Sequence, residues 1–250
     1  MKYVNEKDLK EFIDRLPELQ INPPTVHLMM LAVRSRKAKE ILGKKIHDLV
    51  VEREIIRKIP DWRTRYFNSV YNLSVLQHEG RYEVQGLMAP AEAMGIFATL
   101  SPRNVMGASA DLFSDNIRLL YRPDDSQRAE LSKIGSRYFG CLHRHKDRTT
   151  NFVTADLDTD DPVIFKEVKD ALSVIPFYMV TETSRGFHII MNITKQEDAK
   201  VFYGQNGLMQ QLGLKYTKYG LEWQKDSQEP VAGTHYYKKG GKDHFVKILQ

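Results

Sequence analysis

The sequence predicts an α/β (α+β) fold, with a helical N-terminal region ahead of a mixed or antiparallel sheet. The chain has 250 residues, enough for one large domain or a domain with a smaller appendage. Apolar residues recur at helical spacing near the N-terminus, and from about residue 80 the period changes to that of strands. We therefore expect residues 1–79 to form an N-terminal helical region packed on a domain over 80–250.

Within the first part, the pattern predicts consecutive helices. The first begins near residues 5–8 and ends at Pro17. A second helix is predicted over roughly 25–37, and a third, with a buried apolar stripe, over roughly 38–58. A further helix is predicted over 63–77.

The second part alternates strands and helices. Residues 82–87 and 95–100 have the composition of strands, and helical character returns over 104–121 and over 124–134. A strand over 152–158 follows.

After that strand, Asp161 precedes a proline, which predicts a helix capped by a carboxylate. Strands at 177–181 and 187–193 make the segment from 152 to 193 a β-α-β unit. A helix over 196–212 then precedes a basic, β-rich tail.

The composition argues against a membrane-spanning, a disulfide-bonded or a secreted protein. Apolar residues make up 42% and charged residues 28%, as in ordinary globular proteins, and the longest apolar run near the N-terminus, residues 26–33, is too short to span a bilayer. Cys141 is the single cysteine, so disulfides within the chain and multi-cysteine zinc modules are excluded. Charged residues near the start argue against a secretory signal, and we expect a cytoplasmic protein without a membrane partner.

The net charge of +5 is compatible with a polyanionic partner. Lysines crowd the last 40 residues among aromatic side chains, a combination that can neutralise phosphates and stack on bases. A solvated lysine-rich surface over a small aromatic core explains the same pattern. The candidates for nucleic-acid contact are Lys225, Lys238, Lys239 and Lys242.

Asp156 and Asp158 lie two residues apart in an otherwise apolar run. In a strand they project from the same face, where two like charges repel each other. Such a pair at a strand end is typical of a site for Mg²⁺ or Mn²⁺. A solvated edge strand with two carboxylates is the alternative.

A second polar group follows the β-α-β crossover. Ser184 offers a hydroxyl, Arg185 a cation and Gly186 a backbone that a ligand can approach closely. His188 alternates with apolar neighbours on its strand, and the single crossover from Asp158 places it near the acids. Together they predict a cradle for a triphosphate.

A third acid, Asp226, precedes the turn Pro230–Thr234. Taken in order, the aspartate pair, the segment 184–188 and Asp226 with its turn resemble the archaeo-eukaryotic primase superfamily, specifically its small prim-pol (primase-polymerase) type. Residues 97–103, ending in Ser-Pro-Arg, look like that family's strand ending in Asn-Pro-Arg. Residues 31–36 are similar to a helix that leads CRISPR-associated prim-pols.

The resemblance covers residues 80–250 well and the first 80 weakly. Ala232 stands where the family usually has proline, and the cysteine-rich zinc element of many primases is missing.

The resemblance implies a primase-polymerase catalytic core with an RRM-like β-α-β unit. It implies template-directed nucleotidyl transfer with two Mg²⁺ or Mn²⁺ ions held by Asp156, Asp158 and Asp226. The nucleotide-binding residues it implies are Ser184, Arg185, Gly186, His188 and Arg103. The partners it implies are nucleoside triphosphates, a single-stranded DNA template with its primer, and a helicase or other replication or CRISPR proteins.

Other functions fit parts of the pattern. A metal-dependent nuclease or phosphohydrolase would also use three acids and a histidine. A non-catalytic nucleic-acid-binding replication protein would explain the basic tail but not the paired aspartates. A rolling-circle initiator needs two histidines flanking an apolar residue, and arginine separates His143 from His145. Cys141 with these histidines is spaced poorly for zinc.

Overall fold

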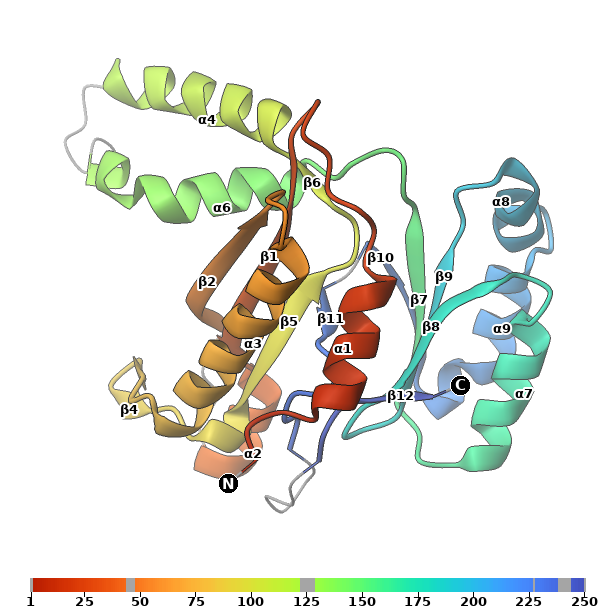
Figure 1. Cartoon of the computed structure of the whole chain (residues 1–250). Helices are drawn as coiled ribbons and strands as arrows, with labels where there is room; N and C mark the ends of the chain where they lie inside the picture. Colours follow the sequence, from red (N-terminus) through yellow and green to blue (C-terminus); the bar gives the residue numbers. More distant parts are fainter. Residues whose placement is uncertain (1, 44–47, 122–128, 227, 238–243, 250) are drawn as a thin grey trace.

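The computed structural model of the protein describes residues 2–43, 48–121, 129–226, 228–237 and 244–249. Two sheets lie side by side, and every strand pairing within these residues is antiparallel (Figure 1). Helices pack on both sheets, which confirms the predicted α+β class. No helix in the described part of the chain is both long and apolar enough to cross a bilayer.

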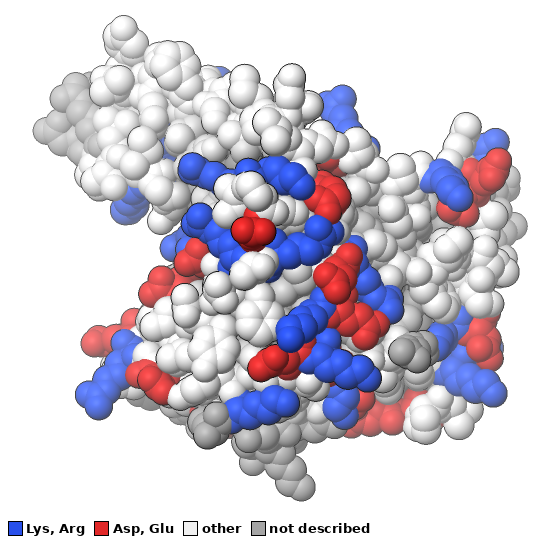
Figure 2. Space-filling view, in the orientation of Figure 1, with Lys and Arg blue, Asp and Glu red and all other residues white. Residues whose placement is uncertain are grey.

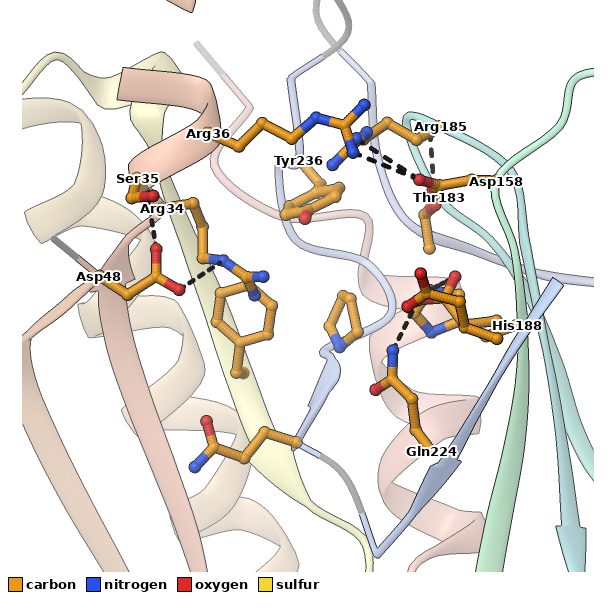
Figure 3. Close-up of a pocket in the computed structure, with 15 residues that line it drawn as sticks. Arg34, Ser35, Arg36, Asp48, Asp158, Thr183, Arg185, His188, Gln224 and Tyr236 are labelled. Carbon is orange, nitrogen blue, oxygen red and sulfur yellow. Dashed lines mark hydrogen bonds and ion pairs between the residues drawn. The ribbon is translucent and has the colours of Figure 1, made fainter. Parts of the chain in front are cut away.

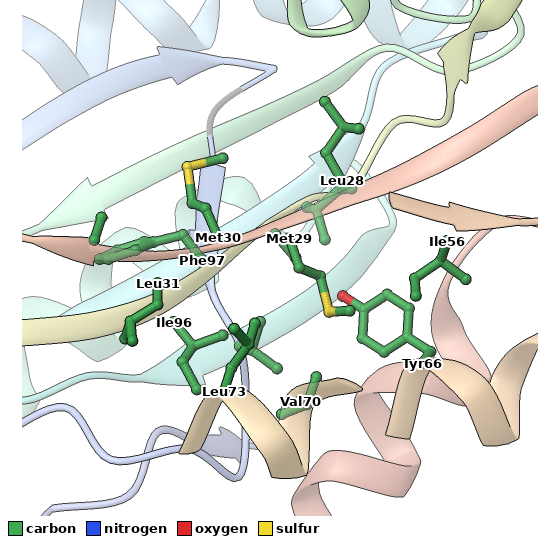
Figure 4. Close-up of a cluster of buried hydrophobic side chains, with 14 of the residues drawn as sticks. Leu28, Met29, Met30, Leu31, Ile56, Tyr66, Val70, Leu73, Ile96 and Phe97 are labelled. Atoms are coloured by element: carbon green, nitrogen blue, oxygen red, sulfur yellow. The ribbon is translucent and has the colours of Figure 1, made fainter. Parts of the chain in front are cut away.

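The first sheet is built around a central strand that is buried along its whole length. Its order is β11 (Gln228–Pro230), β5 (Met94–Thr99), β1 (Thr25–Val33), β2 (Leu49–Arg57), with β6 (Arg103–Asn104) also paired to β1. One face packs against α3 (Trp62–Glu79), where Met29 and Leu31 contact the layer of Tyr66, Val70 and Leu73 (Figure 4). Helix α1 (Glu6–Arg15) packs against α3 in turn.

The prediction of helices over 25–37 and 38–58 is wrong. Both segments contain strands, β1 and β2, and among their described residues only α2 (Ser35–Leu42) is helical. Residues 26–33 carry an apolar side chain or a buried histidine at every position, so the segment buries both faces in a sheet rather than one stripe of a helix. The first sheet therefore joins strands from both sides of the expected boundary at residues 79 and 80. The helices expected at the N-terminus and over 63–77 are confirmed as α1 and α3.

The second sheet has the order β10 (Leu221–Lys225), β7 (Phe152–Leu157), β9 (Phe187–Asn192), β8 (Phe177–Glu182), β12 (Lys247–Leu249). Helix α7 (Pro162–Leu172) connects β7 to β8, and β9 lies between these two parallel strands. The order along the chain is β-α-β-β-α-β, a split β-α-β arrangement, so the predicted β-α-β unit is confirmed. The expected helix over 196–212 is divided into α8 (Gln196–Tyr203) and α9 (Leu208–Tyr216).

Two helices form an arm beside the first sheet (Figure 1). They are α4 (Val105–Leu120), which confirms the helix expected over 104–121, and α6 (Ile134–Arg144). The helix expected to begin at residue 124 lies partly outside the described residues, and a 3-10 turn over Ala129–Lys133 leads into α6. The strand expected over 82–87 is a short hairpin, β3 (Glu83–Val84) and β4 (Leu87–Met88). Asp161 caps α7 as predicted, because its Oδ1 accepts a hydrogen bond of 2.8 Å from the Val163 amide.

The fold depends on the layer between β1 and α3. We expect Leu31→Ala to lower the free energy of unfolding by about 2–5 kcal/mol, because it leaves a cavity beside a side chain that is 0% exposed. Leu214→Ala, at a position that is 83% exposed, should change it by less than about 0.5 kcal/mol. Urea denaturation followed by circular dichroism measures both, and equal effects would contradict the assigned core.

Candidate active site

One face of the second sheet carries a row of polar side chains. Glu222 on β10, Asp156 on β7 and His188 on β9 are direct cross-strand partners, so their side chains share a face. The residues between them along each strand point the other way and pack on α7, α8 and α9. This alternation places the polar row toward the first sheet.

Between the two sheets lies a pocket of about 280 Å³ (Figure 3). Its lining comes from both sheets, with Phe97 and Gln228 contributed by the first and Asp156 by the second. Charged and polar groups dominate the lining, unlike the apolar clefts that bind most small molecules. The other charged or polar lining residues are Arg34, Ser35, Arg36, Asp48, Asp158, Thr183, Arg185, His188, Glu222, Gln224 and Tyr236.

Asp156 and Asp158 project to the same side, as the sequence predicts. Asp156 accepts a 2.6 Å hydrogen bond from the Gln224 amide, and its other oxygen lies 3.2 Å from His188 Nε2. Asp158 lies 3.5 Å from the guanidinium groups of both Arg36 and Arg185. Cationic and hydrogen-bonding groups therefore offset the repulsion between the two carboxylates.

His188 is held between two carboxylates. Its Nδ1 lies 2.6 Å from Glu229 Oε2, and its Nε2 faces Asp156. Glu229 comes from β11 of the first sheet, is 1% exposed, and accepts a 2.6 Å hydrogen bond from Thr154. Burial alone would lower the pKa of His188, but the carboxylates of Glu229 and Asp156 outweigh it and raise the pKa to about 10. The imidazole is therefore a cation at neutral pH.

Cations gather where α2 begins. Arg34 and Arg36 line the pocket, and Lys37 donates a 3.1 Å hydrogen bond from its ammonium group to the hydroxyl of Ser184. Burial lowers the pKa of Lys37 to about 8, and Arg185 adds to the effect. Asp48 already accepts a hydrogen bond from the Ser35 amide at the start of the helix and pairs with Arg34, so Arg36, Lys37 and Arg185 supply the remaining positive charge for an anion.

The predicted segment 184–188 contributes to this surface. Ser184 and Arg185 line a hollow next to the pocket, together with Arg36, Lys37 and Asp158. Gly186 has a different role from the one expected, because a Cβ there would lie 1.9 Å from the carbonyl oxygen of Leu157. The glycine therefore permits close packing against the end of β7 rather than against a ligand.

Asp226 does not join the other two aspartates. It follows β10, and its amide donates a 3.0 Å hydrogen bond to the carbonyl of Phe152, four residues or about 13 Å along β7 from Asp156. Its carboxylate instead forms a 2.7 Å ion pair with Arg103. The structure therefore does not bring Asp226, the third expected ligand, together with Asp156 and Asp158, and Glu222, opposite Asp156, lines the pocket.

Arg103 does not line the pocket either. It is 1% exposed. One of its guanidinium nitrogens lies 2.7 Å from the Asp226 carboxylate and also donates a 3.1 Å hydrogen bond to the carbonyl of His143. A contact between Arg103 and a nucleotide, as expected from the sequence, is inconsistent with this burial. The residue instead stabilises the junction between β6, α6 and the end of β10.

Lys225, the candidate lysine that the structure describes, does not line the pocket. Lys225 is on the opposite face of β10 from Glu222 and Gln224, and its ammonium lies 4.4 Å from the centre of the Tyr203 ring. Lys238, Lys239 and Lys242 lie outside the described residues.

The zinc alternative has no geometric support. His143 Nε2 contacts the Gln228 amide at 2.6 Å, His145 Nε2 contacts Asp111 at 2.7 Å, and Cys141 is buried. Among residues 2–43, 48–121, 129–226, 228–237 and 244–249, no three His, Cys, Asp or Glu side chains are grouped so as to hold an ion by themselves.

The pocket nevertheless offers the donors that a hard cation prefers. Asp156, Asp158 and Glu222 present carboxylate oxygens to one open space. Mg²⁺ keeps several water ligands and is usually bound by one or two carboxylates together with substrate phosphates, so a complete protein cage is not required. These residues therefore fit Mg²⁺ or Mn²⁺ better than the predicted set with Asp226.

Comparison with protein-family models, with curated proteins and with solved structures found no match to the chain.

The sequence did not point to several residues that form the pocket. Glu222 and Glu229 can be recognised as site residues only once the strand register is known, because neither belongs to a local sequence motif. The string Arg34-Ser35-Arg36 was a usable signal, since it concentrates charge directly after a strand that is buried at every position.

The cationic state of His188 gives a pH prediction. Its folded pKa of about 10 exceeds the usual 6.5, so its ion pairs contribute fully below pH 6.5, and the contribution is lost as pH rises through 10. The difference in unfolding free energy between wild type and His188→Gln should therefore shrink from pH 6 to pH 10. Urea titrations in EDTA measure it, and a constant difference would contradict the assignment.

The ion pair of Asp226 gives a stability prediction. Asp226→Asn should lower the free energy of unfolding by about 3–5 kcal/mol, because Arg103 would remain buried without a counter-charge. Asp14→Asn, at an exposed position on α1, is the matched control and should stay within about 0.5 kcal/mol of wild type. If Asp226→Asn unfolds like the control, the structural role is refuted.

Proposed function

We propose that the protein is a small primase-polymerase that transfers nucleotides to a nucleic-acid primer in a template-directed reaction. The observation that carries the proposal is that carboxylates and arginines line the same pocket. Asp156, Asp158 and Glu222 line it together with Arg34, Arg36 and Arg185, and Asp158 lies 3.5 Å from the guanidinium groups of both Arg36 and Arg185. A nucleoside triphosphate bound to a divalent cation has the complementary arrangement of charge.

The chain's own residues would divide the work between the metal and the phosphates. Asp156 and Asp158 would hold Mg²⁺ or Mn²⁺, with Glu222 as the third carboxylate. The ions, when bound, supply Lewis acidity that activates the primer hydroxyl and neutralises charge on the leaving pyrophosphate.

The arginines of the pocket would bind and orient the triphosphate. Arginine can contact phosphate oxygens through two parallel N–H donors, and Arg36 and Arg185 lie next to Asp158, where the metal-bound end of the triphosphate would lie. His188, fixed at Nδ1 by Glu229, presents Nε2 beside Asp156 and can donate from there to a phosphate oxygen. Holding the reacting groups in this way lowers the barrier mainly through positioning.

A metal-dependent nuclease or phosphohydrolase could use the same carboxylates. The cationic groups of α2 and Arg185 favour a triphosphate over a single phosphodiester, because they extend the charge beyond the carboxylates. Release of pyrophosphate with primer extension separates transfer from hydrolysis.

Glu222→Gln and Asp156→Asn should each lower nucleotide incorporation by more than about 100-fold. Mutation of a residue that only hydrogen-bonds to a metal ligand typically lowers metal affinity or activity by about 10–100-fold, and loss of a ligand itself should have a larger effect. Both residues are partly exposed, so the circular dichroism spectrum should be unchanged. The assay is extension of a labelled primer on a single-stranded template with Mn²⁺ and each class of nucleoside triphosphate.

Glu197→Gln, at an exposed position on α8, is the control and should extend the primer as wild type does. Extension retained by Asp156→Asn would rule out this pocket as the site of the reaction, and no extension by the wild type would rule out the proposed activity. Extension retained by Glu222→Gln alone would remove this residue from the ligand set.

A further inference from the structure

Strand β2 at the edge of the first sheet separates its charges between its two faces. Arg53 and Arg57 project from one face, and Glu52 and Glu54 alternate onto the other. Glu52 contacts the hydroxyl of Tyr82 at 3.4 Å on that other side. Neither arginine forms an ion pair within the described part of the chain, so one face of this edge carries two uncompensated cations.

The arginine-bearing face is the one that holds the catalytic pocket. Arg53 on β2 is the cross-strand partner of Met30 on β1, and Met30 is also the partner of Phe97 on β5. Phe97 lines the pocket. Two strand spacings, about 10 Å, separate Arg53 from Phe97. Arg57 lies about 13 Å further along β2 on the same face. A chain leaving the pocket across the sheet would therefore meet the arginines in turn.

An apolar hollow of about 380 Å³ adjoins Arg57. Its walls come from the first sheet, through Val26 and Ile55, and from the α4–α6 arm, through Val105 and Tyr138. The guanidinium of Arg53 lies 5.8 Å from the centre of the adjacent Phe139 ring. In Figure 2, several Lys and Arg side chains gather beneath the mostly uncharged outer surface of the arm.

We propose that Arg53, Arg57 and this hollow bind single-stranded nucleic acid on its way to or from the catalytic pocket. The inference rests on the proposed function, which requires such a strand. Charge complementarity carries it, because the arginines can neutralise successive phosphates while bases pack against the apolar and aromatic walls. The acidic residues of β2 face away and do not oppose the phosphates.

The test is binding of a fluorescein-labelled oligothymidylate of 20 nucleotides, measured by anisotropy at several salt concentrations in EDTA and without nucleotide. Removing two phosphate contacts should reduce the slope of log K against log[salt] by about 1.4, or roughly 25-fold in affinity at 0.1 M salt. We expect this change for Arg53→Ala combined with Arg57→Ala.

The matched control removes two cations elsewhere. Lys7→Ala combined with Arg65→Ala changes exposed positions on α1 and α3 and should keep the wild-type slope.

Each outcome decides between the two proposals. If the wild type extends primers but the double β2 variant keeps the wild-type slope, the inference is overturned and the proposed function stands. If the slope falls for the double β2 variant but neither the wild type nor any variant extends a primer, the inferred binding surface is supported and the proposed function fails. A dimer in sedimentation that the β2 variant alone abolishes, with an unchanged slope, would assign the face to a second copy of the chain and overturn the inference.

Discussion

The arrangement of the pocket depends on how buried and half-buried carboxylates are compensated. Glu229 is almost completely buried between the two sheets, and a charge in that position is stable only with close partners. Thr154 and His188 supply them, both from the second sheet, while Glu229 itself belongs to the first. One electrostatic requirement therefore fixes the imidazole, orients Asp156 and joins the two walls of the pocket.

The same rule accounts for Asp226 and Arg103. A buried guanidinium without a counter-charge is destabilising. The carboxylate of Asp226, which follows β10, neutralises the guanidinium of Arg103. The backbone of Asp226 has φ +50°, an uncommon value for a residue other than glycine, at the point where the chain leaves the second sheet for the first. An acid that local sequence associates with chemistry thus supports the architecture instead, and the acid beside the aspartate pair, Glu222, comes from the strand register.

Local chemistry in the sequence predicted part of this structure well. The i and i+2 spacing of Asp156 and Asp158, the cap at Asp161 and the β-α-β crossover each depend on short-range rules, and all were confirmed. The strands β1 and β2 were not predicted, because continuous apolar runs are compatible with a buried helix or a buried strand until a partner is known. The roles of Glu222, Glu229 and Arg103 were missed or mistaken for a similar reason, since each depends on which distant residue lies opposite.

The connection between β10 and β11 is only two residues long, from Lys225 at the end of one strand to Gln228 at the start of the other. The chain thus passes within a few residues from one wall of the pocket to the opposite wall. Together with the bridge through Glu229, this short link sets the width of the slot before any substrate arrives. Such preorganisation lowers the entropic cost of binding a ligand, including the nucleotide proposed above.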